Sequence, residues 1–142
     1  MIRFRSGVGI DAPTHLEWSA HRLSVKPCPN IAILFPRSDP RKDIARKLGN
    51  QPELFLVAMQ DGTLAGTVMA GYDGHRGWVN YLAVDPALRR HAIGRALMRE
   101  AERLLTARGC PKLNLQVRSG NAEVLAFYRA IGYAQDEVIS LG

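Results

Sequence analysis

The stretch VDPALRRHAIGRAL, residues 84–97, decides the fold. It ends an apolar run at Val84, breaks at Pro86, and then gathers cations and small residues before a helix that begins near Ile93. A helix that starts directly after a strand leaves backbone N–H groups unpaired at the positive end of its dipole. Small residues let an anion approach that backbone closely. The stretch therefore predicts an anion site, with a solvated basic helix start as the alternative that these residues alone leave open.

Three antiparallel strands are expected before this stretch. The apolar run LFLVAM is followed by an Asp-Gly pair, which favours a tight hairpin turn, and by a return strand. A second turn-rich connection, DGHRG, leads into the third strand. The three strands are predicted at residues 54–59, 63–72 and 78–84.

Two helices and two strands are expected after it. Apolar residues recur with helical spacing from Ile93 onward, and Gly109 is the expected stop. Residues 112–117 alternate as a strand should, Asn121 can cap a second helix that Gly132 ends, and residues 133–139 are predicted as a last strand. The predicted order is β-β-β-α-β-α-β, an α/β (α+β) fold.

The N-terminal part is less clearly patterned. Asp39 followed by Pro40 predicts the start of a helix over residues 39–50. Asp11 and Pro13 suggest another helix, through about Leu23, and the proline-rich segment between the two helices has no assigned structure. Since no linker composition separates the halves, we expect residues 1–142 to form one domain.

Composition narrows the class of protein. No apolar run approaches the roughly 20 residues that span a bilayer, and the N-terminus lacks the apolar core of a signal peptide, so a cytoplasmic protein without membrane contact is expected. Cys28 and Cys110 have no spacing typical of a metal site or a disulfide framework. The net charge of +6 suits an anionic partner. Nucleic acid is not expected to be that partner, because the aromatic residues do not interleave with basic runs.

Two motifs resemble those of the GNAT acetyltransferases. LAVDP followed by RRHAIG, residues 82–94, resembles the family's acetyl-CoA motif, Arg/Gln-x-x-Gly-x-Gly/Ala. Residues 121–133 resemble its Asn-x-x-Ala-x-x-x-Tyr-x-x-x-Gly-Phe/Tyr segment. The segments GTVMAGYDGHRG, GCPKLNLQVR and DPRKDIARK are similar to the small bacterial members of the YpeA type. Residues 1–36 match only weakly.

The resemblance implies a single GNAT-like domain. Its mostly antiparallel mixed sheet would be flanked by helices and splayed at the acetyl-CoA site. The implied activity is transfer of an acetyl group from acetyl-CoA to an amine by direct attack on the thioester, without a metal. Tyr128 looks like the general acid for the departing thiolate. Cofactor binding is implied for Leu82, Ala83, Val84, Arg89, Arg90, His91, Ala92, Ile93, Gly94, Arg95 and Asn121; for Asn121, helix capping is an equally good reading.

The sequence departs from the motifs at two positions. Ala92 replaces the family's first glycine, and its methyl group is expected to weaken cofactor binding without abolishing it. Asn80 stands where many members carry a glutamate base and cannot take a proton. His75 is the candidate base by intrinsic pKa, with Asp73 beside it, although both residues are also ordinary turn formers.

Two matters stay open at the level of sequence. The acceptor could be a protein N-terminus, a lysine side chain or a small amine, and a homodimer is compatible with everything above. The departures at Asn80 and Ala92 also suit an acyl-CoA-binding sensor that has lost turnover. Release of free CoA thiol on a panel of amines distinguishes the enzyme from the sensor.

Overall fold

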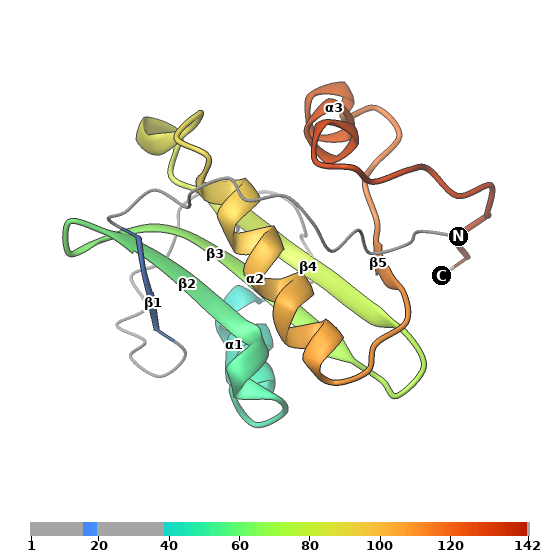
Figure 1. Cartoon of the computed structure of the whole chain (residues 1–142), viewed down its shortest axis with the longest axis horizontal. Helices are drawn as coiled ribbons and strands as arrows, with labels where there is room; N and C mark the ends of the chain where they lie inside the picture. The colour runs from blue at the N-terminus through green and yellow to red at the C-terminus, as the bar shows by residue number, and fades with distance from the viewer. Residues whose placement is uncertain (1–15, 20–38, 142) are drawn as a thin grey trace.

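The structure is a computed structural model that describes residues 16–19 and 39–141 (Figure 1). A single mixed sheet carries the helices in this part of the chain. The elements, in chain order, are β1 (Leu16–Ser19), α1 (Pro40–Leu48), the 3₁₀ turn η1 (Pro52–Leu54), β2 (Phe55–Gln60), β3 (Thr63–Tyr72), β4 (Gly77–Val84), the 3₁₀ turn η2 (Pro86–Leu88), α2 (Ile93–Ala107), β5 (Leu113–Leu115) and α3 (Ala122–Ala130).

The sheet has the strand order β1-β2-β3-β4-β5. β1 to β4 pair antiparallel and β5 runs parallel to β4, which confirms the predicted mostly antiparallel mixed sheet. The turn between β2 and β3 is the expected Asp-Gly pair. Asp61 and Gly62 have φ values of 50° and 74°, as a tight hairpin turn of the primed type requires.

β4 and β5 separate after a short contact. Their pairing begins at Gly77 opposite Leu113 and ends at Val79 opposite Leu115. β4 continues to Val84 and remains paired with β3 on its other side up to that residue. The second half of β4 therefore has no β5 residue beside it, and this is the expected splay between the two strands.

Side-chain caps start two of the helices where the sequence predicts them. The Asp39 carboxylate accepts a hydrogen bond from the Arg41 N–H at 3.0 Å, ahead of proline at the first turn of α1. The Asn121 side-chain oxygen accepts from the Val124 N–H at 3.2 Å and caps α3. The chain leaves α2 at Gly109, whose φ of 75° is the left-handed conformation that ends helices.

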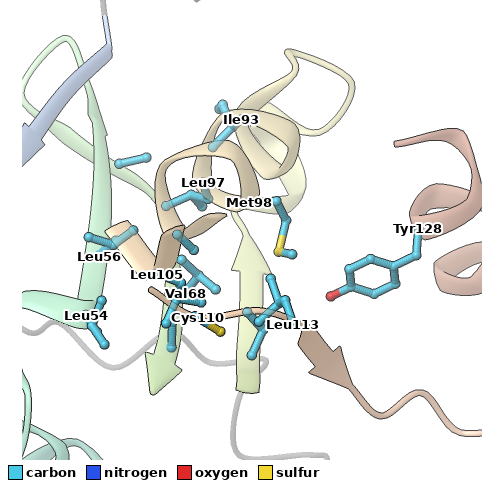
Figure 2. Close-up of a cluster of buried hydrophobic side chains, with 14 of the residues drawn as sticks. Leu54, Leu56, Val68, Ile93, Leu97, Met98, Leu105, Cys110, Leu113 and Tyr128 are labelled. Carbon is cyan, nitrogen blue, oxygen red and sulfur yellow. The ribbon is translucent and has the colours of Figure 1, made fainter. Parts of the chain in front are cut away.

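The core lies between α2 and the sheet. Figure 1 shows α2 in front of the sheet and α1 behind it. Leu97, Met98 and Leu105 of α2 are fully buried against residues such as Val68 and Leu113 of the strands (Figure 2). Burying a side chain of this size contributes about 1.5–3 kcal/mol to stability.

Gly66 on β3 allows α2 to lie close to the sheet. A Cβ atom at Gly66 would lie 2.8 Å from the Ala83 carbonyl oxygen, 3.1 Å from Leu97 and 3.2 Å from Ile93. Ordinary contacts are longer, so neither β4 nor the first turns of α2 could keep their positions over a larger residue. Gly66 therefore fixes how deeply the start of α2 sits on the strands.

Three predictions of secondary structure need correction. Residues 133–139 are not a strand, since they pair with no strand of the described sheet. Side-chain contacts attach the segment instead: Tyr133 bonds to Glu102 and Asp136 pairs with Lys112. Residues 16–19 form β1, paired with β2, where a helix from Asp11 to about Leu23 was predicted. The strand predicted over residues 112–117 is limited to β5. The rest of the predicted N-terminal helix lies outside the described residues, as does Cys28.

Candidate functional site

The site begins where β4 turns into α2. The Asp85 N–H donates to the Ala65 carbonyl at 2.9 Å, which extends the β3–β4 ladder by one bond. The Asp85 carboxylate then accepts from the Ala87 N–H at 2.8 Å and caps η2. These two bonds direct the chain out of the sheet over a few residues, and the exposed motif that follows starts from a fixed position.

The motif backbone alternates in conformation. Arg90 and Ala92 have φ values of 67° and 59°, whereas His91 between them and Ile93 after them lie outside the left-handed region. Successive residues of alternating hand turn their N–H groups toward one point and form a concave anion site. Ala92 is thus an N-cap residue in a conformation that favours glycine.

The first N–H groups of α2 are unpaired within the helix. Its first backbone bond joins the Ala96 N–H to the Ala92 carbonyl at 2.9 Å, so the N–H groups of Ile93, Gly94 and Arg95 have no acceptor inside the helix. The first turn of α2 contains no acidic residue. Three cationic side chains and one imidazole are exposed around it, namely Arg89, Arg90, Arg95 and His91. The arrangement suits a multiply charged anion such as a phosphate ester.

Gly94 has a packing role that sequence reasoning missed. A Cβ atom there would lie 3.3 Å from the Phe127 ring of α3 and 3.5 Å from Val84. The glycine therefore lets α3 approach the start of α2, while its N–H group stays unpaired in the helix. A bulky residue at position 94 would displace α3 as well as hinder an anion.

β4 carries a bulge next to the site. Thr67 of β3 pairs with Ala83, but Met69 pairs with Asn80, so Tyr81 and Leu82 together oppose a single β3 residue. Tyr81 has a φ of 54°, and its hydroxyl donates to the Asp43 carboxylate of α1 at 2.9 Å. Bulges redirect side chains and interrupt pairing. The bulge lies where β4 has separated from β5.

Asp43 links this bulge to α1. A hydrogen bond from Arg46 has the largest effect on the Asp43 carboxyl and lowers its pKa; burial opposes this, and the weaker effect of the Tyr81 bond lowers the pKa further. The carboxylate is therefore charged near neutral pH. Neither Tyr81 nor Asp43 was singled out by the sequence, because a tyrosine in a strand and an aspartate in a polar helix carry no distinctive spacing.

Tyr128 points from α3 toward the core between α2 and the sheet (Figure 2). Figure 2 shows its ring reaching toward Leu113 of β5 with the hydroxyl foremost. The residue is only 8% exposed, and burial raises its pKa to about 12. Within residues 16–19 and 39–141 no hydrogen bond to this hydroxyl is found, and no fully buried side-chain oxygen lacks a partner. The hydroxyl thus keeps some access to solvent and is protonated at neutral pH.

A second tyrosine supports the first. The rings of Tyr128 and Tyr133 meet edge to face, with centroids 5.6 Å apart and planes at 70°. The Tyr133 hydroxyl donates to the Glu102 carboxylate of α2 at 2.6 Å. Burial raises the pKa of Glu102, opposed by this bond, and burial and the bond together raise the pKa of Tyr133. Glu102 adjoins the apolar face of α2 between Met98 and Leu105, which was the one sequence signal for it.

His75 lies apart from these residues. It is exposed on the β3–β4 hairpin, before the first residue of β4, whereas the motif follows the last. At about 3.3 Å per residue, the strand between them spans roughly 23 Å. Asp73 shapes this hairpin by accepting from the N–H groups of His75 at 2.7 Å and Arg76 at 2.6 Å, and these bonds lower its pKa. The structure thus gives Asp73 a turn-forming role and leaves His75 at the opposite end of β4 from the motif residues.

Neither a metal-ligand cluster nor a membrane-spanning helix is found in the described residues. Across residues 16–19 and 39–141, no group of three or more His, Cys, Asp or Glu side chains is arranged to hold a metal ion. No helix in the same ranges is long and apolar enough to cross a membrane.

Comparison with known proteins gives one family. The model of the acetyltransferase (GNAT) family matches residues 14–133. A Yersinia pseudotuberculosis protein named acetyltransferase is 49% identical over 110 residues, which are 78% of each chain. It is one of several bacterial relatives of the same name and similar identity.

Solved structures agree on the fold. Ard1 from Thermoplasma volcanium matches with a TM-score of 0.60 and 28% identity, over 64% of this chain and 62% of that one. The aminoglycoside acetyltransferase AAC(6')-Iy, solved with a bisubstrate analogue built on CoA, matches with a TM-score of 0.65 and 18% identity, over 79% and 84%. At that identity the second match speaks for the fold alone.

Proposed function

The chain belongs to the acetyltransferase (GNAT) family, and on that premise we propose that it transfers an acetyl group from acetyl-CoA to an amine acceptor. The observation that supports this most strongly is the concave set of N–H groups at the start of α2, beside a half-strand of β4 that β5 does not cover. Relatives of the fold have been solved with CoA or with a CoA-based analogue.

The pyrophosphate of acetyl-CoA would lie on the backbone from Arg90 to Arg95. The N–H groups of Ile93, Gly94 and Arg95 can donate to phosphate oxygens, and the exposed arginines add charge without base specificity. The Ala92 methyl group stands at the rim of this backbone. Asn121 already uses its side-chain oxygen as the cap of α3, so its amide NH₂ group is what remains for the cofactor.

The pantetheine arm would follow β4. Ala83 and Val84 pair with β3 on one side, Leu82 lies in the bulge, and none of the three has a β5 neighbour on the other side. Their backbone groups that face away from β3 can therefore bond to the amides of the arm as an added strand would. This direction carries the thioester from the start of α2 toward the Tyr81 bulge and the Tyr128 hydroxyl.

The chemistry needs one proton donor and one neutral amine. The amine lone pair attacks the thioester carbonyl carbon, the C–S bond breaks, and the departing sulfur takes a proton from the Tyr128 hydroxyl. The amine's surplus proton passes to water, and the Tyr128 phenolate regains a proton from water before the next turnover. With a pKa of about 12, Tyr128 enters each turnover protonated. The apolar surroundings that disfavour a phenolate also disfavour a thiolate, so they raise the proton affinity of the leaving sulfur too.

The site contains no clear general base for the acceptor amine. Asn80 lies exposed on β4 next to the bulge and cannot accept a proton. His75 is a poor substitute, since Arg76 and three residues of β4, Gly77 to Val79, lie between it and Asn80. We propose that the rising limb of the pH–rate profile follows the deprotonation of the acceptor amine itself, and that His75→Ala leaves this limb unchanged.

The test of the acid role is Tyr128→Phe. The variant keeps the ring that packs against Phe127 and Tyr133 and loses a hydroxyl without a hydrogen-bond partner among the described residues, so stability should change little. We expect kcat to fall by on the order of 10²- to 10⁴-fold with acetyl-CoA affinity unchanged. The assay is release of free CoA thiol on peptide N-termini, lysine peptides and small amines. Tyr72→Phe, which removes a hydroxyl bonded to the Gly74 carbonyl in the β3–β4 hairpin, is the matched control.

An acyl-CoA sensor is the second candidate, and Asn80 is the observation that favours it. A protein without a carboxylate at this position could bind acetyl-CoA and transfer nothing. Calorimetric binding of acetyl-CoA together with no thiol release on any amine of the panel would establish the sensor in place of the enzyme.

A further inference from the structure

We propose that Glu102 and Tyr133 form a positioning pair that holds the Tyr128 ring in place. This inference rests on the proposed function for its catalytic meaning but not for its structural test. The pair joins α2, whose first turn would hold the pyrophosphate, to the segment after α3, the helix that carries Tyr128. It is therefore a direct connection between the two halves of the candidate site.

The Glu102–Tyr133 contact is stronger than an ordinary surface hydrogen bond. Its length is 2.6 Å, within the range of a hydroxyl donating to a carboxylate, and both side chains are at least half-buried. Burial has the largest effect on the pKa of the Glu102 carboxyl and raises it, because the charged form has lost part of its hydration. The charge of Arg99 also lowers the pKa of Glu102, but by less than the Tyr133 bond does. A half-buried carboxylate needs a hydrogen-bond donor, so the bond fixes the direction of the Tyr133 ring.

The Tyr133 ring in turn limits where Tyr128 can lie. Tyr128 is held between two aromatic neighbours, with Phe127 at 5.1 Å and 66° and Tyr133 at 5.6 Å and 70°. Both contacts are edge to face, a geometry that depends on the angle between the rings. Phe127 moves with α3 because it is adjacent in the helix, and Met98 of α2 offers the Tyr128 ring only non-directional packing (Figure 2). Tyr133 is therefore the aromatic neighbour whose hydrogen bond to Glu102 ties the angle of the Tyr128 ring to α2. The Tyr133 N–H also donates to the Tyr128 carbonyl at 3.0 Å.

The pair can be broken without touching Tyr128. Glu102→Leu removes the acceptor, whereas Glu102→Gln keeps an oxygen that can accept from the Tyr133 hydroxyl. Tyr133→Phe removes the donor and keeps the ring. Tyr72→Phe removes a tyrosine hydroxyl on the β3–β4 hairpin and serves as the control.

The structural readout is fluorine NMR of the protein labelled with 3-fluorotyrosine. The chain has four tyrosines, and each resonance is assigned by a Tyr→Phe substitution. We expect the Tyr128 resonance to shift or broaden in Glu102→Leu and Tyr133→Phe and to stay in place in Glu102→Gln and Tyr72→Phe. An unmoved Tyr128 resonance in Glu102→Leu would overturn the proposal, as would an equal change in Glu102→Gln.

The kinetic readout separates this proposal from the proposed function. If both hold, Glu102→Leu and Tyr133→Phe each lower kcat by on the order of 10-fold with KM for acetyl-CoA unchanged, the double variant is no worse than either single one, and Glu102→Gln is near parental. A moved Tyr128 resonance with parental kcat would uphold the positioning pair and remove Tyr128 from the chemistry. Failure of the parent to transfer acetyl groups at all would reject the enzyme and leave the NMR result to decide the pair.

Discussion

Ala92 has a left-handed backbone conformation that favours glycine, and this determines how its replacement changes stability. Its φ of 59° brings the Cβ atom close to the backbone, a strain of about 1–2 kcal/mol, whereas glycine costs about 0.5–1 kcal/mol of chain entropy. We therefore expect Ala92→Gly to raise the free energy of unfolding by up to about 1 kcal/mol and to leave acetyl-CoA affinity equal or better. Urea unfolding and calorimetry measure the two.

Ala87→Gly is the control for Ala92→Gly. Ala87 is exposed in η2 and lies outside the left-handed region, so its replacement should lower stability by about 0.5–1 kcal/mol. If both substitutions destabilised the protein alike, the strain at Ala92 would be refuted. A large loss of affinity in Ala92→Gly would instead show that the methyl group belongs to the binding surface.

Glu102 predicts a dependence of stability on pH. Burial raises its pKa in the folded protein above the ordinary value of 4.5, so the folded state binds a proton more tightly than the unfolded state. This contribution to stability is fully present below pH 4.5 and is lost as pH rises through the folded pKa. Glu102→Gln has no such titration. We expect the free energy of unfolding of Glu102→Gln, relative to that of the parent, to increase as pH rises from 4 to 7. A difference between the two that does not change with pH would contradict the assignment.

The location of residues that lie close together in a sequence motif could be predicted from the sequence. The location of residues that meet only through tertiary contacts could not. The positions from Arg89 to Arg95 lie together at the start of α2 as expected. His75 was chosen for its pKa and its nearness in sequence to β4, but it precedes the strand and the site follows it. Glu102 and Tyr133 are 31 residues apart and meet only once α2 and α3 are placed.

Gly66 makes a prediction about how two elements fit. A methyl group at 2.8 Å from the Ala83 carbonyl oxygen must push β4 or α2 away, at a cost of about 1–3 kcal/mol. Because Ile93 and Leu97 share this contact, Gly66→Ala should also weaken acetyl-CoA binding. Thermal unfolding and calorimetry are the measurements. Gly120→Ala, where a Cβ atom meets nothing within 4 Å, should leave both quantities unchanged.

The best-predicted helices and strands are those whose ends are marked by a capping residue or a turn sequence. The caps at Asp39 and Asn121 and the Asp-Gly turn all act within a few residues, and α1, α3 and the β2–β3 hairpin are where the sequence put them. The last predicted strand, residues 133–139, followed a helix-ending glycine but has no strand to pair with among the described residues, and a stretch of chain becomes a strand only with a partner. β1 shows the opposite error: its pairing with β2 overrides a helix start read from Asp11 and Pro13.

The molecule as a whole should respond to acetyl-CoA unevenly. Hydrogen exchange is expected to slow at the amides of residues 82–84 and 90–95 on binding, because these groups are unpaired or lie beside the unpaired edge without ligand. Residues 73–76 of the β3–β4 hairpin should not change. Protection spread equally over both ends of β4 would indicate a general stiffening and would contradict the proposed binding site.

The early end of the β4–β5 ladder also bears on how the protein behaves in a crowded solution. Backbone groups left open along a strand attract strands of other chains and can start aggregation. Here the open edge lies inside the sheet, along residues 82–84. The charged side chains and bulges that prevent an outer strand from pairing with other chains do not protect an edge at this position. A bound pantetheine arm would close that edge. The same molecule that delivers the acetyl group would then keep the protein dispersed, and depletion of the CoA pool would cost solubility as well as turnover.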